Sequence, residues 1–372
     1  MAEVKDYGEL FTADILVVGG SMSGLTTAIR AKENNPELDI LVIDKGIIGW
    51  NGQSTKAGNG IRSTSKHPDG VMNALGYLVH AHTPFLNDQE FLKRYLEVHR
   101  DNIDYMKHCG VQVSCDEDGN ATPLTFIPDA LDMAGVSINV NAQLRAFALK
   151  LGIRLMSRVN VFELLTSKTG KVIGAIGFGM DKGECKIFHA KAVAMATQGC
   201  HFKKIGLEFM GYGTGVGAMY RVGAVMRNVE FSTQVDVVFK KTNTPIYGGF
   251  NMICNKNGEN LTQKYIGHLE WEVTPALVNA MVKEVAAGNG PLWVDLEQPD
   301  EVRMMIGGTD MDESTQRMMR DKMAWEHLVF SKTAKNIGEV GTKPEATIKT
   351  VIQVEPVKVD TDIRTDVEGL WA

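Results

Sequence analysis

The sequence predicts an α/β fold interrupted by an α+β domain, and three observations support this prediction. A strand-like run, a glycine turn, a helical pattern and a second strand-like run follow one another within residues 13–44. Further β-rich runs and a second glycine-rich helix start follow between residues 153 and 217. The sequence becomes turn-rich near residue 235, which indicates a separate domain. Strands that alternate with helices are typical of a parallel sheet covered on both faces.

The first unit of the chain is a βαβ unit. Ile15–Val18 is a short apolar run with β-branched residues, and it predicts a buried strand. The helical pattern after the glycine turn has to end before Pro36, because proline has no N–H to donate. Ile40–Ile43 predicts a second buried strand, and two parallel strands joined by a helix require a right-handed crossover. This order is that of a Rossmann-like domain.

The rest of the chain continues the alternation of strands and helices. Residues 49–64 have no periodicity and predict a loop rich in glycine and hydroxyl groups. Apolar residues at helical spacing predict helices over residues 88–108, 140–151, 275–286 and 312–328. Strands are predicted near Ile153–Leu165, Lys171–Met180, Lys186–Ala190, Ala192–Thr197 and within Val351–Trp371, and a helix is predicted to start within Gly211–Gly217.

Composition argues against several classes of protein. Lys and Arg number 39 against 45 Asp and Glu, and a net charge of −6 does not suit a protein whose main task is to bind nucleic acid or an anionic membrane. No secretory signal is visible, and the apolar runs fall short of the ~20 residues that span a membrane. Five cysteines without a CxxC pair argue against a disulfide framework, a metal site or an iron–sulfur cluster held by this chain. We therefore expect a cytoplasmic protein without membrane insertion.

The glycine turn has the chemistry of a pyrophosphate site. The free N–H groups and the dipole of a helix N-terminus favour an anion, and glycines let the backbone come close to it. Gly19 and Gly24 fill the first and third positions of the pattern G-x-G-x-x-G, and Ser21 replaces the second glycine. Asp44 ends the second strand, where an acid binds the ribose hydroxyls of a dinucleotide. An ordinary tight turn is the alternative, but the strand, helix and acid together favour nucleotide binding.

The residues after Asp44 favour FAD over NAD. Lys45 and Gly46 follow the acid, and a glycine-rich loop comes next, which suits a large cofactor that needs a second run of backbone contacts. Ala192–Gly199 reads as a strand that runs into a turn. It resembles the A-T-G-G strand end that closes over the cofactor in flavoproteins of the two-dinucleotide-binding type, with Gln198 in place of the first glycine.

The order of the motifs resembles the fumarate reductase/succinate dehydrogenase flavoprotein superfamily over essentially the whole chain. The motifs are the glycine turn, Asp44-Lys45, the Ser54–Gly60 loop, Ala196–Gly199, Gly215–Phe231, Gly288–Asp295 and Arg364–Trp371. The last three look most like the flavoprotein (alpha) subunit of adenylylsulfate reductase. Each motif is loose by itself, and their collinear order carries the resemblance.

The resemblance implies a Rossmann-like FAD-binding domain interrupted by a capping domain. Residues 1–235 would form the FAD-binding domain with a helical insertion at about 85–140, residues 236–350 the capping and substrate domain, and residues 351–372 a return to the FAD-binding domain. It implies that FAD is held by residues of five segments: Gly19, Ser21, Met22, Ser23 and Gly24; Asp44, Lys45 and Gly46; Gln53, Ser54, Thr55, Ala57, Gly58, Asn59 and Gly60; Val161; and Thr197, Gln198 and Gly199.

Departures from the family pattern limit what can be carried over. Gln53 stands where the succinate dehydrogenase branch has a histidine bonded to the flavin, so we expect non-covalent FAD. Val216 replaces an acidic residue, and Lys264–Lys283 contains no arginine to serve as the proton donor of fumarate reductases. The catalytic residues therefore stay open, with His268 and Glu272 as candidates in the expected capping domain.

Three functions stay open at this point. The first is an FAD-dependent oxidoreductase that transfers a hydride between flavin N5 and a small anionic substrate. The second is an electron-transfer flavoprotein with an iron–sulfur, ferredoxin-like partner. The third is a truncated, non-catalytic nucleotide-binding paralogue. The family pattern continues after G-L-W-A into a second glycine-rich turn and a helical domain, whereas the sequence stops at Ala372, so the resemblance implies that these segments are missing from it.

Overall fold

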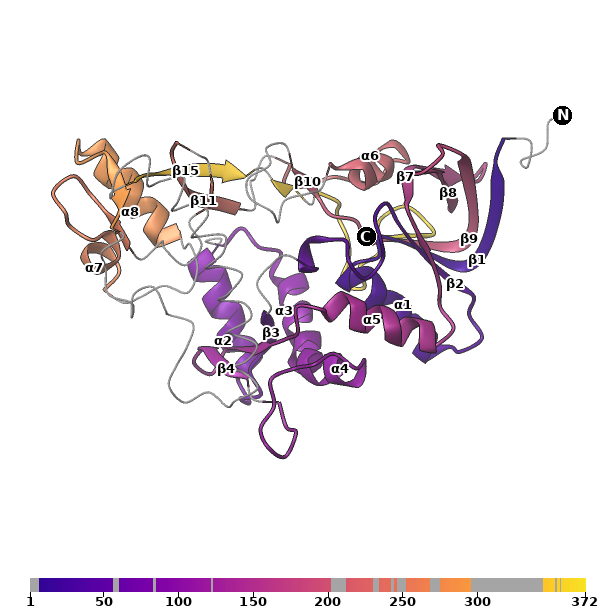
Figure 1. Cartoon of the computed structure of the whole chain (residues 1–372), viewed down its shortest axis with the longest axis horizontal. Helices are drawn as coiled ribbons and strands as arrows, with labels where there is room; N and C mark the ends of the chain where they lie inside the picture. The colour runs from indigo at the N-terminus through magenta and orange to yellow at the C-terminus, as the bar shows by residue number, and fades with distance from the viewer. Residues whose placement is uncertain are drawn as a thin grey trace.

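The structure is a computed structural model in which three groups of elements follow one another along an elongated molecule (Figure 1). It describes residues 7–55, 60–82, 85–121, 123–201, 212–229, 234–241, 244–245, 252–267, 275–295, 344–351, 353–354 and 356–372. A large, mainly parallel sheet lies at one end, a helical insertion lies below the middle, and a smaller sheet with two helices lies at the other end. Among the described residues, no helix has the length and apolarity needed to cross a membrane.

The described residues include a seven-stranded sheet whose path runs β6-β2-β1-β9-β8-β7, with β17 also paired to β9. Its strands are β1 (Glu9–Val18), β2 (Ile40–Asp44), β6 (Arg154–Ser157), β7 (Val159–Thr166), β8 (Val172–Gly179), β9 (Cys185–Met195) and β17 (Leu370–Trp371). The helices α1 (Met22–Asn34), α5 (Val140–Lys150) and α6 (Thr214–Arg221) accompany it. The predicted βαβ unit is therefore present, and α1 ends before Pro36 as expected.

Strand direction brings the cofactor motifs to one edge of this sheet. β1 pairs in parallel with β2 and with β9, and β2 pairs in parallel with β6. The register places Val18 opposite both Ile43 and Met195, so β1, β2 and β9 end at the same level. The two strands predicted at 186–190 and 192–197 are one continuous strand, β9. Its first half pairs with β8, and its second half pairs in parallel with β17.

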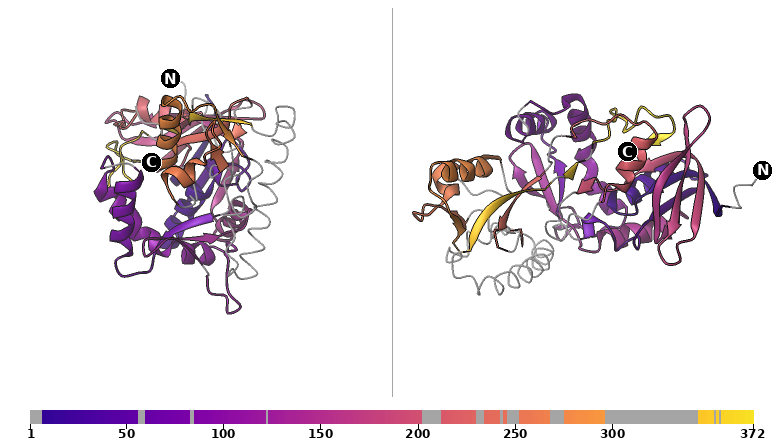
Figure 2. Two further views of the ribbon diagram at one scale, coloured as in Figure 1. Left: turned by 90° about the vertical axis from the view of Figure 1, so that its left-hand side faces the viewer. Right: turned by 90° about the horizontal axis from the view of Figure 1, so that it is seen from above.

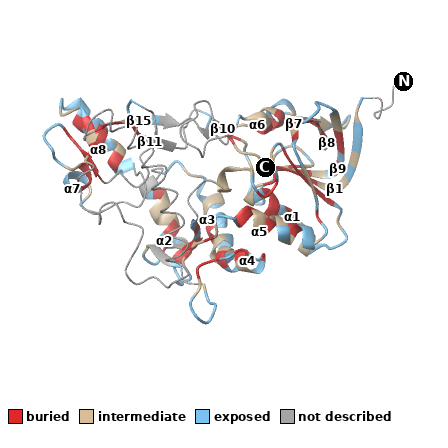
Figure 3. Cartoon of the chain, viewed as in Figure 1, coloured by how far each residue is buried: buried red, intermediate tan, exposed pale blue. Residues whose placement is uncertain are grey.

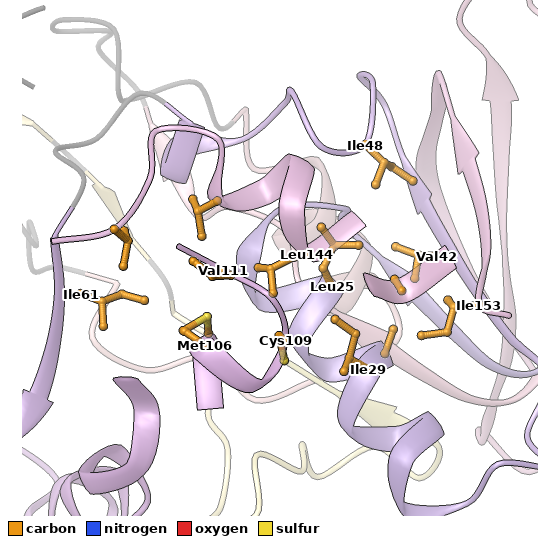
Figure 4. Close-up of a cluster of buried hydrophobic side chains, with 14 of the residues drawn as sticks. Leu25, Ile29, Val42, Ile48, Ile61, Met106, Cys109, Val111, Leu144 and Ile153 are labelled. Atoms are coloured by element: carbon orange, nitrogen blue, oxygen red, sulfur yellow. The ribbon is translucent and has the colours of Figure 1, made fainter. Parts of the chain in front are cut away.

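The sheet has an apolar core on each face. On one face, Leu25 and Ile29 of α1 pack with Val42 of β2 and Leu144 of α5 (Figure 4). Apolar residues of α1 recur three and four positions apart, so they form one stripe that faces the sheet. A second cluster on the same strands includes Phe188 of β9 and residues of α6. Buried residues accordingly gather in the strands and on the inner sides of α1 and α5 (Figure 3).

The helical insertion differs from its prediction in two ways. Its elements are β3 (Gly60–Thr64), α2 (Gly70–Tyr77), the π-helical turn Leu78–His82, α3 (Gln89–Val98), the 3₁₀ turn His99–Asp101, α4 (Asn102–His108), β4 (Leu124–Ile127) and β5 (Leu131–Gly135). The predicted loop 49–64 ends in β3, because those residues pair with the distant strand β5. The predicted helix 88–108 breaks at His99, where Thr64 Oγ1 donates to the Leu96 carbonyl oxygen that a continuous helix would use.

The third group has its own sheet and its own core, at the far end of the molecule from β1 (Figure 2). Its elements are β11 (Gln234–Phe239), β12 (Thr244–Pro245), β13 (Ile253–Cys254), α7 (Leu261–Tyr265), α8 (Pro275–Ala286), β14 (Leu292–Val294) and β15 (Glu345–Val351). These five strands form a sheet in the order β12-β11-β15-β14-β13. Outside this group, β10 (Cys200–His201), which follows β9, pairs with β16 (Gln353–Val354). The helix predicted at 275–286 is α8, and the helix predicted at 312–328 lies outside the described residues. The capping-domain boundaries stay a prediction.

The two chain connections to this third group run side by side. Met226 forms an antiparallel bridge with Val357. The Arg227 N–H donates to the Pro356 carbonyl at 2.6 Å, and the Lys358 N–H donates to the Val225 carbonyl at 2.9 Å. We call residues 225–227 and 356–358 the paired tether. The chain therefore leaves the parallel-sheet region and returns to it through the same place.

A buried carboxylate organises the helices of the third group. Glu284 of α8 is 1% exposed and accepts hydrogen bonds from Tyr265 (2.6 Å) and from the Asn255 side chain (2.9 Å). The Lys264 ammonium lies 2.8 Å from Glu284 Oε1, the oxygen that also accepts from Tyr265. These bonds, led by that from Lys264, lower the pKa of Glu284 to about 2. The Glu284 carboxylate of α8 thus holds α7 through Lys264 and Tyr265, and all these partners belong to the third group.

We expect the core around α5 to be sensitive to cavity formation. Leu144 is fully buried and Leu149, on the same helix, is 45% exposed. Leu144→Ala should lower the free energy of unfolding by about 2–5 kcal/mol, because a buried leucine leaves a cavity. Leu149→Ala should change it by less than about 0.5 kcal/mol. Urea unfolding of the two variants checks this, and equal losses would contradict the packing of α5 described here.

The pKa of Glu284 gives a second prediction, on acid stability. Its folded pKa, about 2, lies below the ordinary value of 4.5, so the ionised form stabilises the folded chain above about pH 4.5. This contribution should disappear as the pH falls from about 4.5 toward 2. Glu284→Gln should lower the thermal midpoint at pH 6 and lose much of its deficit in acid. The exposed Glu368→Gln is the control, and a pH-independent deficit for Glu284→Gln would count against the argument.

Candidate functional site

The candidate site lies where the parallel strands of the large sheet end. The turn at Gly19 follows β1, Asp44 is the last residue of β2, and Ala196 follows β9. Because β1, β2 and β9 are parallel, these three segments meet at one edge of the sheet. Open α/β sheets bind their ligands outside the carboxyl ends of the strands. The sequence-predicted residues of the glycine turn, the Asp44 segment and the Thr197 segment are therefore brought together.

Two glycines of the turn are required by close backbone contacts. Gly19 has φ +114°, a conformation that side chains rarely adopt, and a Cβ there would overlap the Ala196 carbonyl. A Cβ at Gly24, in the first turn of α1, would overlap the Gly19 carbonyl oxygen. The N-terminus of α1 therefore comes directly against the end of β1, and it faces the edge where the three strands end.

The first turn of α1 is arranged to receive an anion. Ser21 is the N-cap residue, with φ −90° and ψ −166°, but its side chain makes no capping hydrogen bond. The described first turn contains no acidic residue. The N–H groups that follow Ser21 are therefore not used by a side-chain cap, and the positive end of the helix dipole is not neutralised by a carboxylate. Both features suit a pyrophosphate group.

Asp44 holds the neighbouring segments in place. It is 8% exposed, and its Oδ2 accepts the Gly20 N–H at 2.7 Å. Its Oδ1 accepts the Gly46 N–H at 2.7 Å and the Asn51 side-chain amide at 2.6 Å. A carboxylate has about four acceptor sites, so capacity for a further donor remains. Asp44 thus fixes the glycine turn and can still accept a further donor.

The loop after β2 crosses to the segment after β9. Gln53, in a 3₁₀ turn over Gln53–Thr55, accepts a hydrogen bond from the Gln198 side chain at 2.6 Å. Thr55 Oγ1 donates to the Gly52 carbonyl at 2.7 Å within the same turn. The two segments that were predicted to hold FAD are therefore in direct contact, although they lie far apart in the sequence.

Two residues of the site were missed by the sequence analysis. Asn51 bonds Asp44, and Asn141 of α5 bonds Ser21 (3.1 Å) and Ser54 (3.1 Å). A signal for Asn141 was present, since it shares the buried stripe of Leu144 and Ala148, where a polar side chain needs a partner. Nothing local marks Asn51, whose Asn-Gly pair reads as an ordinary turn.

The remaining predicted residues do not share one environment. Val161 is buried in β7 and packs in the second apolar cluster of the sheet. The Lys45 ammonium lies 4.8 Å from the centre of the Tyr212 ring, and desolvation there lowers its pKa while Asp44 opposes the shift. Gly60 begins β3 and is exposed, whereas Gly199 is buried. Ala57, Gly58, Asn59, His268 and Glu272 lie outside the described residues.

One buried polar atom at the edge supports a ligand there. Thr197 Oγ1 is inaccessible and has no hydrogen-bond partner among the described residues. It lies against Gly215 in the first turn of α6, where a Cβ would overlap it. Together with the free first turn of α1 and the bonded Asp44, this fits a dinucleotide cofactor. The arrangement defines a dinucleotide-binding α/β protein.

Comparison with known families is more specific. The FAD binding domain family matches residues 14–372, and the chain belongs to this family. Its cofactor is therefore FAD, as predicted. The 8-methylmenaquinol:fumarate reductase flavoprotein subunit of Wolinella succinogenes is 20% identical over 74% of the chain, and a Mycobacterium tuberculosis fumarate reductase flavoprotein subunit is 24% identical over 68%. The chain spans 47% and 45% of the length of these relatives.

Solved structures agree on the fold. The FrdA chain of E. coli quinol fumarate reductase matches with a TM-score of 0.77 at 19% identity, covering 98% of this chain and 64% of that one. Adenylylsulfate reductase from Archaeoglobus fulgidus matches with a TM-score of 0.71 at 18% identity, covering 98% and 66%. The resemblance to the fumarate reductase/succinate dehydrogenase flavoprotein superfamily is confirmed, and so is the predicted fold class.

Removal of the Asp44 carboxylate should weaken FAD binding. Asp44→Ala should lower the affinity by about 1–3 kcal/mol, since charge-assisted hydrogen bonds to the glycine turn are lost together with the ribose contact. Titration of the apoprotein with FAD measures this. Asp14→Ala is the matched control, because Asp14 lies in the middle of β1, four residues before Val18, and bonds Lys191 and the Asp39 N–H instead of the glycine turn. Equal affinity of Asp44→Ala and wild type would contradict the assigned role.

Proposed function

We propose that the chain is the FAD-binding part of an oxidoreductase that acts on a small anionic substrate. The observation that carries the proposal is the edge of the large sheet, where an uncapped helix N-terminus and a bonded carboxylate meet. Bound FAD supplies two-electron chemistry, with hydride transfer at flavin N5. Membership of the FAD binding domain family and the names of the fumarate reductase relatives support the reaction class.

In this proposal the protein's share is positioning and electrostatics. The first turn of α1 binds the pyrophosphate through its backbone N–H groups. Asp44 orients the adenosine ribose while it holds the glycine turn through Gly20. The contact between Gln53 and Gln198 closes the two loops over the continuation of the cofactor. None of these groups moves a proton, and we expect the acid or base to come from the capping domain.

The Gln53 side chain argues for non-covalent FAD. An amide has no nucleophilic lone pair like that of an imidazole nitrogen, and Gln53 Oε1 is already engaged as an acceptor from Gln198. We therefore propose that the cofactor is retained by hydrogen bonds and packing alone, with the loop over Gln53–Thr55 acting as a wall rather than an anchor.

A second candidate is an electron-transfer flavoprotein with an iron–sulfur partner. It is favoured by the likeness of three motifs to the adenylylsulfate reductase flavoprotein and by the fact that the curated relatives are named as subunits. The two candidates differ in where the electrons go. Reduced holoprotein should be reoxidised directly by a small dicarboxylate such as fumarate in the first case. In the second, it should pass electrons to a ferredoxin-like protein and react slowly with the dicarboxylate.

Acid precipitation tests the state of the cofactor. FAD-loaded protein should show the two visible bands of oxidised flavin, and acid should release all the yellow colour into the supernatant. The Gln53→His variant is an informative comparison, since it restores the imidazole of the succinate dehydrogenase branch. Colour that stays in the wild-type pellet would refute non-covalent binding. A colourless protein that takes up no added FAD would refute the proposed function itself.

A further inference from the structure

We propose that Asn141 is a positioning residue of the FAD site, because its amide closes a ring of hydrogen bonds that holds the Ser21 hydroxyl in place at the start of α1. The inference rests on FAD binding at this edge. The ring consists of Asn141, Ser21 and Ser54, and we call it the amide–hydroxyl ring. It joins three segments: the first turn of α5, the glycine turn and the loop after β2.

The position of Asn141 requires an explanation. It lies in the first turn of α5, is fully buried, and has Val140, Leu144 and Ala148 as its neighbours on the buried side of the helix. A buried primary amide is costly unless its donors and acceptor are bonded. An apolar side chain would suit this stripe better as far as packing is concerned. The amide is therefore explained by what it bonds rather than by the core.

The direction of every hydrogen bond in the ring follows from the contacts. Asn141 Nδ2 lies 3.3 Å from the Asn51 carbonyl oxygen, which can only accept, so this atom is the amide nitrogen. The same nitrogen donates to Ser21 Oγ at 3.1 Å. Asn141 Oδ1 accepts from Ser54 Oγ at 3.1 Å, and this uses the single proton of Ser54. In the 2.7 Å contact between the two hydroxyls, Ser21 must therefore be the donor.

The ring determines what Ser21 can do. A serine at the N-cap ordinarily turns its oxygen to accept an N–H of the first helical turn. Here Ser21 Oγ is directed to Ser54 and Asn141, and it makes no capping bond. The N–H groups of that turn are consequently left for the pyrophosphate. Without Asn141, the hydroxyl loses a donor and becomes free to rotate to the capping position, where it competes with the anion.

Asn141 also supports the ribose side of the site. The Asn51 residue that gives its carbonyl to Asn141 donates its own side-chain amide to Asp44 at 2.6 Å. One buried amide is thus connected to the pyrophosphate side through Ser21 and to the ribose side through Asn51. This connection explains why a residue far from both motifs in the sequence should change cofactor affinity.

A double-mutant cycle on Ser21 and Asn141 tests the inference. Asn141→Leu keeps the size of the side chain and removes its polar atoms, and it should raise the Kd for FAD about tenfold or more, as measured by titration of the apoprotein. In a Ser21→Ala background no hydroxyl can turn to the helix and only the connection through Asn51 is left, so the same substitution should raise the Kd by less than about threefold. Fully additive effects, or a wild-type Kd for Asn141→Leu, would overturn the inference.

Controls separate positioning from stability and from the proposed function. Leu144→Ala, one turn along α5, should destabilise the apoprotein and leave the FAD Kd within about twofold of wild type, measured where both are folded. If Asn141→Leu does not fold, the smaller Asn141→Ala replaces it in the cycle, since alanine has no polar atom to bond Ser21, Ser54 or Asn51. Wild-type protein that binds no FAD would refute the cofactor site itself. Wild-type protein that binds FAD, with an unaffected Asn141 variant, would refute only this inference.

Discussion

The carboxylate of Asp44 is the contact on which the rest of the site depends. It is a buried charge, and a buried charge persists in a fold only when its acceptor positions are filled by donors. The donors here are two backbone N–H groups, of Gly20 and Gly46, and the Asn51 amide. The glycine turn and the loop after β2 therefore cannot shift independently of each other. The two loops are therefore joined before any ligand arrives, which reduces the ordering that ligand binding has to supply.

Local patterns in the sequence were sufficient for the βαβ unit and for part of the site. This unit is determined by residues that lie close together in the sequence. They are the apolar runs Ile15–Val18 and Ile40–Ile43, the glycines between them and Asp44 after them. β9 could be recognised as a strand from its own residues. Its pairing with β1 could not, because the two strands lie far apart in the sequence. The same holds for β3, whose five residues have no alternation and become a strand only because β5 pairs with them.

The side-chain contacts of the site were harder to predict than its backbone. Gln53 and Gln198 were each identified from motif positions, yet their mutual hydrogen bond follows only from the fold. Asn141 could have been noticed as a polar residue on an apolar stripe, but its partners Ser21 and Ser54 are set by how α5 packs beside the glycine turn. Helical periodicity over 88–108 predicted one helix, and its break at His99 lies beside a contact with β3 that is distant in the sequence, the Thr64 hydroxyl on the Leu96 carbonyl oxygen.

The paired tether makes the third group an insertion whose two ends lie side by side in the fold. Since residues 225–227 and 356–358 are hydrogen-bonded neighbours, their backbones are separated by about 5 Å, the spacing of adjacent strands. A two-residue turn spans that gap in an ordinary hairpin. Among the described residues of 228–355, none pairs with a strand of the large sheet. The length of this insert can therefore change while the large sheet keeps its register, provided that β16 still pairs with β10.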